Sequence, residues 1–356
     1  MVSVPGIHRN ALAALACVVL AALPGRPAWA RDFKVEDVPS VTAVAPASLK
    51  PDTIVFSDGG GKDVTDAKSG LVRFADWAKT KPLQKEFLCP YPGYEEPTLS
   101  YTRGGSVKKA TRRLHMYVAE ARFALPRAPQ AIDLKHYMNV AFLERMDPVI
   151  KHQLINSGDV TPNSNTKLAN HHPTRRWCES SASTAVPSVC IKSRYKLEGK
   201  LPTAILLLNK LRESGKTIAD FIEFESELRI IPPDEIDQSG LSQLTGIATP
   251  VAAALEQNIV NVNQVMQFGK FLALLQADPA NANRTIVTAF VALAVESDLF
   301  EKRKEFENVP VLRNMVPAQV LSGNSSFNTG ESISAGLPNY ARNRIKALAT
   351  VLRSGE

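Results

Sequence analysis

Alternating and short apolar runs mark the clearest strands of this chain. Because successive side chains of a β-strand point to opposite faces of a sheet, a half-buried strand has a sequence period of two. The pattern predicts strands over residues 53–56, 114–125, 190–201 and 218–231. Between the last two, residues 203–214 have the apolar spacing of a helix, which completes a strand–helix–strand unit.

Apolar residues three or four positions apart predict helices elsewhere in the chain. The predicted helices cover residues 65–79, residues 133–146, a segment from Pro148 to about Gly158, one or two helices within 251–275, and a basic amphipathic helix over 340–353. Residues 285–295 are almost continuously apolar. Such a run predicts either a buried strand or a buried helix, because it has no period that separates the two.

Together these segments predict an α+β fold, in which a curved antiparallel sheet packs against long helices. Residues 53–310 form the expected main α+β domain. Residues 31–52 form an extended N-terminal arm, and residues 311–356 form a loop-rich tail that ends in the amphipathic helix.

The N-terminus has the pattern of a secretory signal peptide. Arg9 precedes an apolar run over residues 11–23, and Ala28-Trp29-Ala30 has the small residues of a cleavage site. An apolar run of this length is too short to span a membrane. The pattern predicts a signal peptide over residues 1–30, cleaved after Ala30, and a mature protein that is periplasmic or secreted.

Export to an oxidising compartment makes a disulfide plausible. Three cysteines remain in the mature chain, and Cys178 and Cys190 enclose a short segment rich in Ser, Ala and Pro. Closing a loop of that size stabilises a protein by about 3 kcal/mol in the chain-entropy model. We expect a Cys178–Cys190 disulfide, with two buried thiols as the alternative, and we expect Cys89 to be buried beside its aromatic neighbours.

Charge is distributed unevenly along the chain. The net charge is +10 over residues 103–200 and −6 over residues 201–310. This asymmetry is typical of two differently charged faces of one fold, or of a positive surface that meets an anionic partner.

The densest cationic cluster lies within residues 103–113, which contain five basic residues and no acidic one. Two further arginines follow His171 and His172 in a polar segment. The candidate anion-binding residues are Arg103, Lys108, Lys109, Arg112, Arg113, Arg175 and Arg176. The alternative is an ordinary solvated loop or helix end. The cluster lacks the interleaved aromatic residues that stack on single-stranded nucleic acid, so we expect no nucleic-acid partner.

Established catalytic and metal-binding motifs are absent from the sequence. It contains no G-x-S-x-G, H-E-x-x-H, C-x-x-C or complete phosphate-binding loop. We therefore expect no metal and no cofactor, and we assign no catalytic residue.

A row of alternating carboxylates is the main acid–base candidate. Glu223, Glu225 and Glu227 share one face of their predicted strand. Such a row can raise a carboxyl pKa, but it is more typical of a solvated face. The favoured interpretation pairs it with Lys192, Arg194 and Lys196 on the preceding strand.

The sequence favours an exported, non-enzymatic binding or accessory protein that holds an apolar or amphiphilic anionic ligand such as a lipid. Its apolar region over 251–300 and its basic segment motivate this hypothesis. One alternative is a periplasmic hydrolase that uses the glutamate row, or His136 near Asp133, for acid–base chemistry. Another is an envelope protein–protein interaction module whose charge asymmetry drives assembly.

Overall fold

The computed structural model describes residues 33–58, 70–103, 105–111, 113–146, 150–156, 188–196, 221–261, 266–297 and 329–354. Several sequence predictions fall outside these ranges and stay predictions. They are the signal peptide, the helix over 203–214, and the positions of Arg112, Arg175, Arg176 and Cys178.

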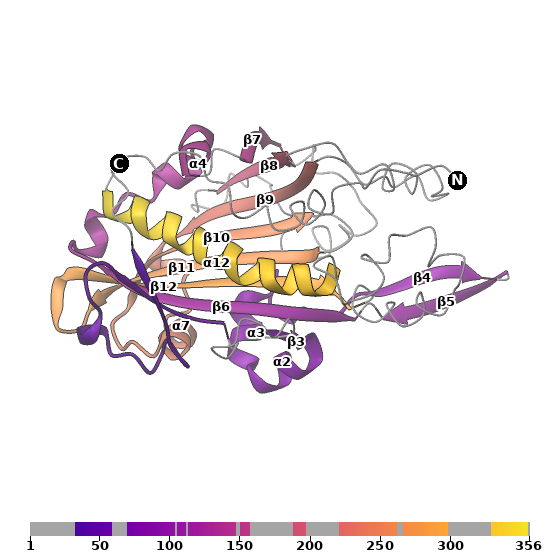
Figure 1. Ribbon diagram of the computed structural model, residues 1–356, viewed down its shortest axis with the longest axis horizontal. Helices are drawn as coiled ribbons and strands as arrows, with labels where there is room; N and C mark the ends of the chain where they lie inside the picture. The colour runs from indigo at the N-terminus through magenta and orange to yellow at the C-terminus, as the bar shows by residue number, and fades with distance from the viewer. Residues whose placement is uncertain are drawn as a thin grey trace, which may run out of the picture.

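The described residues form a mixed α+β structure built on one large, mostly antiparallel sheet. The strand order is β1-β2-β6-β12-β11-β10-β9-β8-β7, and β3 also pairs with β6 (Figure 1). Among the described strands, β1 and β2 pair in parallel and the other pairs are antiparallel. The strands are β1 (Lys34–Asp37), β2 (Thr53–Ser57), β3 (Leu71–Arg73), β6 (Leu114–Leu125), β7 (Ile150–Ile155), β8 (Ser188–Lys196), β9 (Phe221–Ile231), β10 (Val251–Asn261), β11 (Met266–Asp278) and β12 (Asn281–Glu296).

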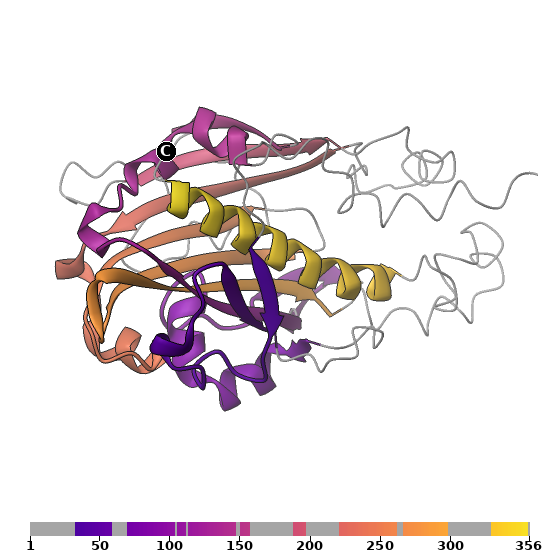
Figure 2. The ribbon, with the colours of Figure 1, turned by 60° about the vertical axis from the view of Figure 1, so that its left-hand side comes forward.

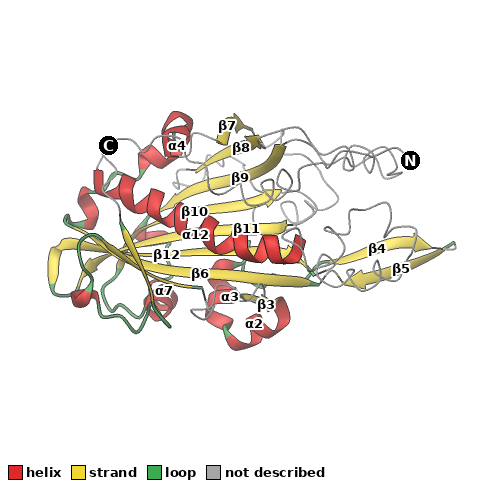
Figure 3. Cartoon of the chain, in the orientation of Figure 1, coloured by secondary structure: helices red, strands yellow, loops and turns green. Residues whose placement is uncertain are grey.

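A separate hairpin and several helices complete the described structure. The hairpin of β4 (Thr98–Arg103) and β5 (Ser106–Thr111) extends away from the main sheet (Figure 3). The α-helices are α2 (Phe74–Thr80), α3 (Pro82–Leu88), α4 (Val140–Met146), α7 (Gln238–Thr245) and α12 (Thr329–Ser354). Short 3₁₀ turns include η3 (Pro129–Ala131) and η4 (Lys135–Met138). None of the described helices is both long and apolar enough to cross a membrane.

The long helix α12 runs across one face of the sheet (Figures 1 and 2). Its residues Ala341, Ile345, Leu348 and Leu352 recur at helical spacing and are buried. They belong to one apolar cluster with alternate residues of the central strands, among them Phe123 of β6 and Val291 of β12. The C-terminal helix is therefore part of the same core as the sheet.

The opposite face of the sheet is covered by α2, α3 and α7. Phe74, Trp77 and Leu88 from the first two helices form a second apolar cluster with Leu272 of β11 and Phe290 of β12. Cys89 is a free, buried thiol in this cluster, next to Tyr94, as the sequence predicted.

The largest error of the sequence analysis concerns strands that lie between two layers of helices. The predicted helices within 251–275 are wrong, because this region forms the antiparallel pair β10–β11. Both faces of these strands are buried, so polar residues do not alternate with apolar ones and the period-two signal is weakened. Residues 285–295, for which the sequence left strand and helix open, lie in strand β12.

Three shorter helix predictions also need correction. The helix expected from Pro148 to Gly158 is wrong, because Ile150–Ile155 is strand β7, paired with β8. The helix expected over 65–79 begins only at Phe74, since Leu71–Arg73 pairs with β6 as β3. The helix expected over 133–146 is divided at Asn139, whose side chain accepts hydrogen bonds from the backbone N–H groups of Ala141 (2.8 Å) and Phe142 (3.4 Å) and so caps α4.

We predict that Leu348→Ala lowers the free energy of unfolding by about 2–5 kcal/mol, because it leaves a cavity between α12 and the sheet. The exposed residue Asn343 on the same helix provides the control, because Asn343→Ala should change the free energy of unfolding by less than about 0.5 kcal/mol. Urea unfolding measures both values. Equal stability of the two variants would mean that α12 does not belong to the core.

Candidate functional site

Four of the predicted anion-binding residues lie in the part of the chain that the structure describes, on or just after one hairpin. Arg103, Lys108 and Lys109 lie on the β4–β5 hairpin, where Lys108 is opposite Tyr101. Arg113 follows the hairpin and is exposed. Just after it, the backbone N–H of Leu114 donates to Glu96 Oε1 at 2.6 Å, which fixes the base of the hairpin.

The glutamate row lies in the strand where it was predicted, but two of its side chains are buried. Strands β8 and β9 pair with Lys192 opposite Glu225 and Arg194 opposite Glu223. However, the exposed fractions of Glu225 and Glu227 are only 2% and 1%. The expectation of a solvated carboxylate face is therefore wrong for these two residues.

Next to this row, β9, β10 and β11 carry a buried ionic cluster on the sheet face opposite α12. Glu256 Oε1 lies 3.0 Å from Lys270 Nζ, and Glu256 Oε2 lies 3.9 Å from Arg229 Nη1. Burial alone would raise the carboxyl pKa of Glu256, but these two cations outweigh it and hold the pKa at about 2. The two cations thus favour the charged form of Glu256, so this carboxylate is not an acid poised to give up a proton.

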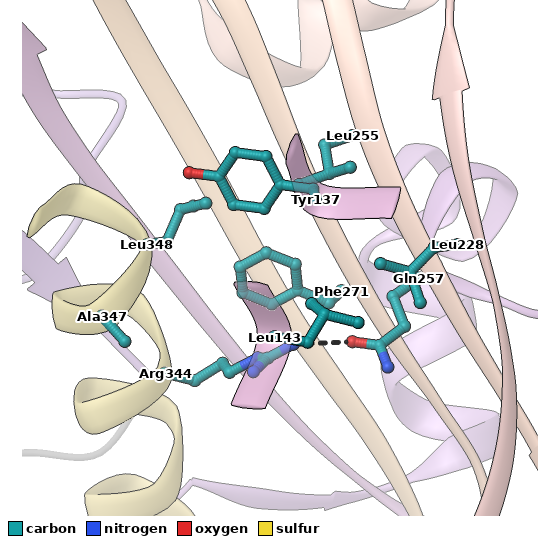
Figure 4. A pocket seen from close by; sticks show the side chains of 9 residues that line it. All are labelled: Tyr137, Leu143, Leu228, Leu255, Gln257, Phe271, Arg344, Ala347 and Leu348. Carbon is teal, nitrogen blue, oxygen red and sulfur yellow. Dashed lines mark hydrogen bonds between the residues drawn. The ribbon is translucent and has the colours of Figure 1, made fainter. Parts of the chain in front are cut away.

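A small apolar pocket lies between α12 and the sheet (Figure 4). It contains about 10 Å³ of free space, which is room for about one water molecule. The lining residues are Tyr137, Leu143, Leu228, Leu255, Gln257, Phe271, Arg344, Ala347 and Leu348. Arg344 is the one charged residue in this lining.

The side chain of Arg344 extends from α12 into the pocket and contacts uncharged side chains there. Its Nη2 donates to Gln257 Oε1 at 3.0 Å, and Gln257 Nε2 donates to Ser226 Oγ at 3.0 Å. Its guanidinium carbon lies 5.7 Å from the centroid of the Phe271 ring, within cation–π range. Among the described residues no carboxylate forms an ion pair with Arg344, so its charge is available to an anion.

A second hollow lies beside the first, towards the C-terminal end of α12, and Tyr137 lines both. It contains about 60 Å³ of free space. The lining residues are Arg127, Ala131, Ile132, Asp133, His136, Tyr137, Phe142, Val351 and Leu352.

The His136–Asp133 pair of the hydrolase hypothesis lies at the rim of this second hollow. His136 Nε2 is 3.7 Å from Asp133 Oδ2, and the side chains are 49% and 59% exposed. Ion pairs this exposed contribute little energy and do not desolvate either group. The pair therefore lacks the burial that is typical of a catalytic acid or base.

A half-buried histidine that the sequence analysis did not single out lies near Arg344. His152 Nδ1 is 2.8 Å from Ser193 Oγ. Burial, with the charge of Arg344, lowers the pKa of His152 to about 4, so the imidazole is neutral at pH 7. Ser193 is fully buried, which argues against a nucleophile that a substrate can reach.

The described residues contain no group of three or more His, Cys, Asp or Glu that could hold a metal ion. The predicted Cys178–Cys190 disulfide stays a prediction, because Cys178 lies outside the described ranges. The sequence analysis also missed Arg344, Gln257 and Tyr137. A usable signal was the position of Arg344 four residues before Leu348, which places a cation on the apolar side of a helix.

Comparisons with known proteins assign no family. No family model matches the chain, and no curated protein matches its sequence. The structure is similar to the crystal structure of Ara h 8.0201 at a TM-score of 0.25 and 10% sequence identity, with 64% of this chain and 99% of that chain covered. A TM-score this low supports no conclusion about fold or function.

We predict that Glu→Gln substitutions at two glutamates of the sheet change the free energy of unfolding in opposite directions at pH 8. Burial raises the pKa of Glu120 on β6 to about 7, from 4.5, so its folded state favours the protonated form and loses stability as the pH rises through this range. Glu120→Gln should therefore raise the free energy of unfolding by on the order of 2 kcal/mol at pH 8 and change it little at pH 4.

Glu256→Gln should lower the free energy of unfolding at both pH 8 and pH 4, since the low pKa of Glu256 stabilises the fold and this stabilisation is lost only as the pH falls towards 2. Urea unfolding of both variants at pH 4 and pH 8 measures the effects. If Glu120→Gln were less stable than the unmodified protein at pH 8, this result would contradict the raised pKa of Glu120.

Proposed function

We propose that this protein binds an apolar or amphiphilic anionic ligand between α12 and the sheet, and that it is an exported carrier or accessory protein. The observation that carries the proposal is the lining of the pocket beneath α12, which is apolar except for Gln257 and the cation Arg344. Ligand sites of proteins typically combine an apolar lining with a few polar groups that orient the ligand. The signal-peptide pattern of residues 1–30 supports export.

A ligand larger than a water molecule requires α12 to move away from the sheet. The ends of the contact are held by surface ion pairs, with Arg342 Nη2 at 2.7 Å from Asp37 Oδ1 and Arg353 paired with Asp52. Exposed pairs of this kind are weak. The apolar cluster is the stronger restraint, and a hydrophobic ligand tail can replace its contacts when the helix moves.

The anionic end of such a ligand would bind Arg344. An arginine that contacts an amide oxygen can exchange it for a carboxylate or phosphate oxygen, and charge-assisted hydrogen bonds are stronger than neutral ones. Gln257 would keep its hydrogen bond to Ser226, while its Oε1 would lose Arg344 as a donor, a cost that the contact with the ligand has to exceed.

The two alternatives have different support. The hydrolase hypothesis has little, because Glu225 and Glu227 are buried on the sheet face away from this pocket and His136 is largely solvated. The interaction-module hypothesis has one favourable observation, the basic β4–β5 hairpin that extends from the body (Figure 1). Self-association that weakens with salt in sedimentation would support the module, and a salt-independent monomer would count against it.

We predict that native mass spectrometry of the protein, purified from its own compartment without denaturation, shows an additional mass that denaturation releases. The physical reason is that a ligand buried under α12 leaves only when the helix moves. A protein refolded from urea serves as the ligand-free control. A native sample with the mass of the bare chain would contradict the proposal.

We also predict that Arg344→Gln weakens binding of dodecanoate about tenfold or more, because it removes the charge that faces the head group. Lys346→Gln is the matched control. It removes a cation from the same helix, and Lys346 lies outside the linings of both hollows. Calorimetric titration measures both affinities. If both variants lost the same affinity for dodecanoate, the effect would come from the net charge of α12 and not from the position of Arg344 in the pocket.

A further inference from the structure

The hydroxyl of Tyr137 is an unusual polar group of this site. The tyrosine is only 3% exposed, and its Oη has no hydrogen-bond partner among the described residues. Burial raises the pKa of its hydroxyl far above the ordinary range, with the guanidiniums of Arg344 and Arg127 acting in the opposite direction. Because buried hydroxyls in proteins almost always have partners, this one calls for an explanation.

The tyrosine ring is held firmly in place. It packs edge-on against Phe142, with ring centroids 5.1 Å apart and an interplanar angle of 69°. Its backbone N–H donates to the carbonyl of Leu134 at 3.0 Å within the turn η4. Figure 4 shows the ring in the pocket beneath α12, with its hydroxyl on the side of Leu348. The hydroxyl thus points into the space beside the helix.

Tyr137 forms a wall between two hollows, and each hollow contains one arginine. Arg344 lines the apolar pocket, and Arg127 lines the neighbouring hollow of about 60 Å³. Arg127 donates one hydrogen bond to the carbonyl of Arg353 at the end of α12. A guanidinium has five N–H donors, so Arg127 can hold α12 and still bind an anion.

We propose that Tyr137 Oη donates a hydrogen bond to the carboxylate head group of an aliphatic ligand, between Arg344 and Arg127, while the aliphatic tail lies along the apolar lining under α12. The proposal rests on the proposed function and names its ligand class, a long-chain monocarboxylate. A hollow of about 60 Å³ has room for roughly four water molecules, which suits a carboxylate.

The rim of the hollow also contains one acidic group. Asp133 lies there, with its Oδ1 accepting from the backbone N–H of Lys135 at 2.8 Å and its Oδ2 near His136. Its negative charge offsets only part of the positive charge of Arg344 and Arg127, so an anionic head group between the two arginines is attracted.

The test compares dodecanoate with dodecanol, which have the same tail and differ in head group, on the full chain by calorimetric titration. The unmodified protein should bind dodecanoate more tightly. Tyr137→Phe should weaken dodecanoate binding about tenfold and dodecanol binding less than about twofold. Tyr94→Phe, which changes a buried tyrosine on the opposite face of the sheet, should alter neither affinity.

Ligand-free stability provides a second readout. A hydroxyl without a partner does not stabilise the empty protein, so Tyr137→Phe should leave its melting temperature unchanged or raise it. A lower melting temperature with equal loss of both ligands would overturn the proposal, because the hydroxyl would then be structural. Arg127→Gln should lower the preference for dodecanoate over dodecanol, and an unchanged preference would also overturn it.

The outcomes separate this proposal from the proposed function. If the unmodified protein binds both compounds equally, the head-group assignment is wrong, and a ligand site under α12 remains. If it binds neither compound, and the native protein has no additional mass, both proposals are wrong. If Tyr137→Phe binds dodecanoate as tightly as the unmodified protein does, the head-group assignment is wrong and the proposed ligand site is not affected.

Discussion

The central strands of this protein are apolar on both faces, and the rest of the described structure follows from that constraint. Each face needs a cover, because exposed apolar surface is costly in water. Helices α2, α3 and α7 cover one face, and α12 covers the other. Helix α12 covers its face alone, and its buried apolar side chains make it part of the core. The proposed ligand site requires this helix to move as well.

The two faces of the sheet differ in how their buried charges are partnered. On the face away from α12, Glu256 lies beside Lys270 and Arg229, which favour its charged form. Under α12, Arg344 contacts an amide and a ring, and Tyr137 Oη has no hydrogen-bond partner among the described residues. Buried polar groups usually have complete sets of partners. Other buried polar atoms without a hydrogen-bond partner, such as Asn258 Oδ1, lie elsewhere in the sheet, so the proposed site rests on Tyr137 together with the two arginines beside it.

The sequence predicted the elements that have one polar and one apolar side. Strands β6, β8 and β9 and the basic part of α12 were found because their polar residues recur with a regular period. Strands β10 and β11 were missed, since burial on both faces weakens that period. The site could not be predicted in full. Gln257 and Tyr137 are far apart in the sequence, and only the sheet and η4 bring them to one pocket under α12.

Hydrogen–deuterium exchange with and without dodecanoate tests most directly whether α12 is the movable wall of a ligand site. A ligand beneath the helix should change the exchange of amides in α12 and in β10 and β11 under it, while α2 and α3 on the other face keep theirs. Unchanged exchange in α12, with changes confined to the β4–β5 hairpin or to the opposite face, would place the ligand elsewhere and contradict the account.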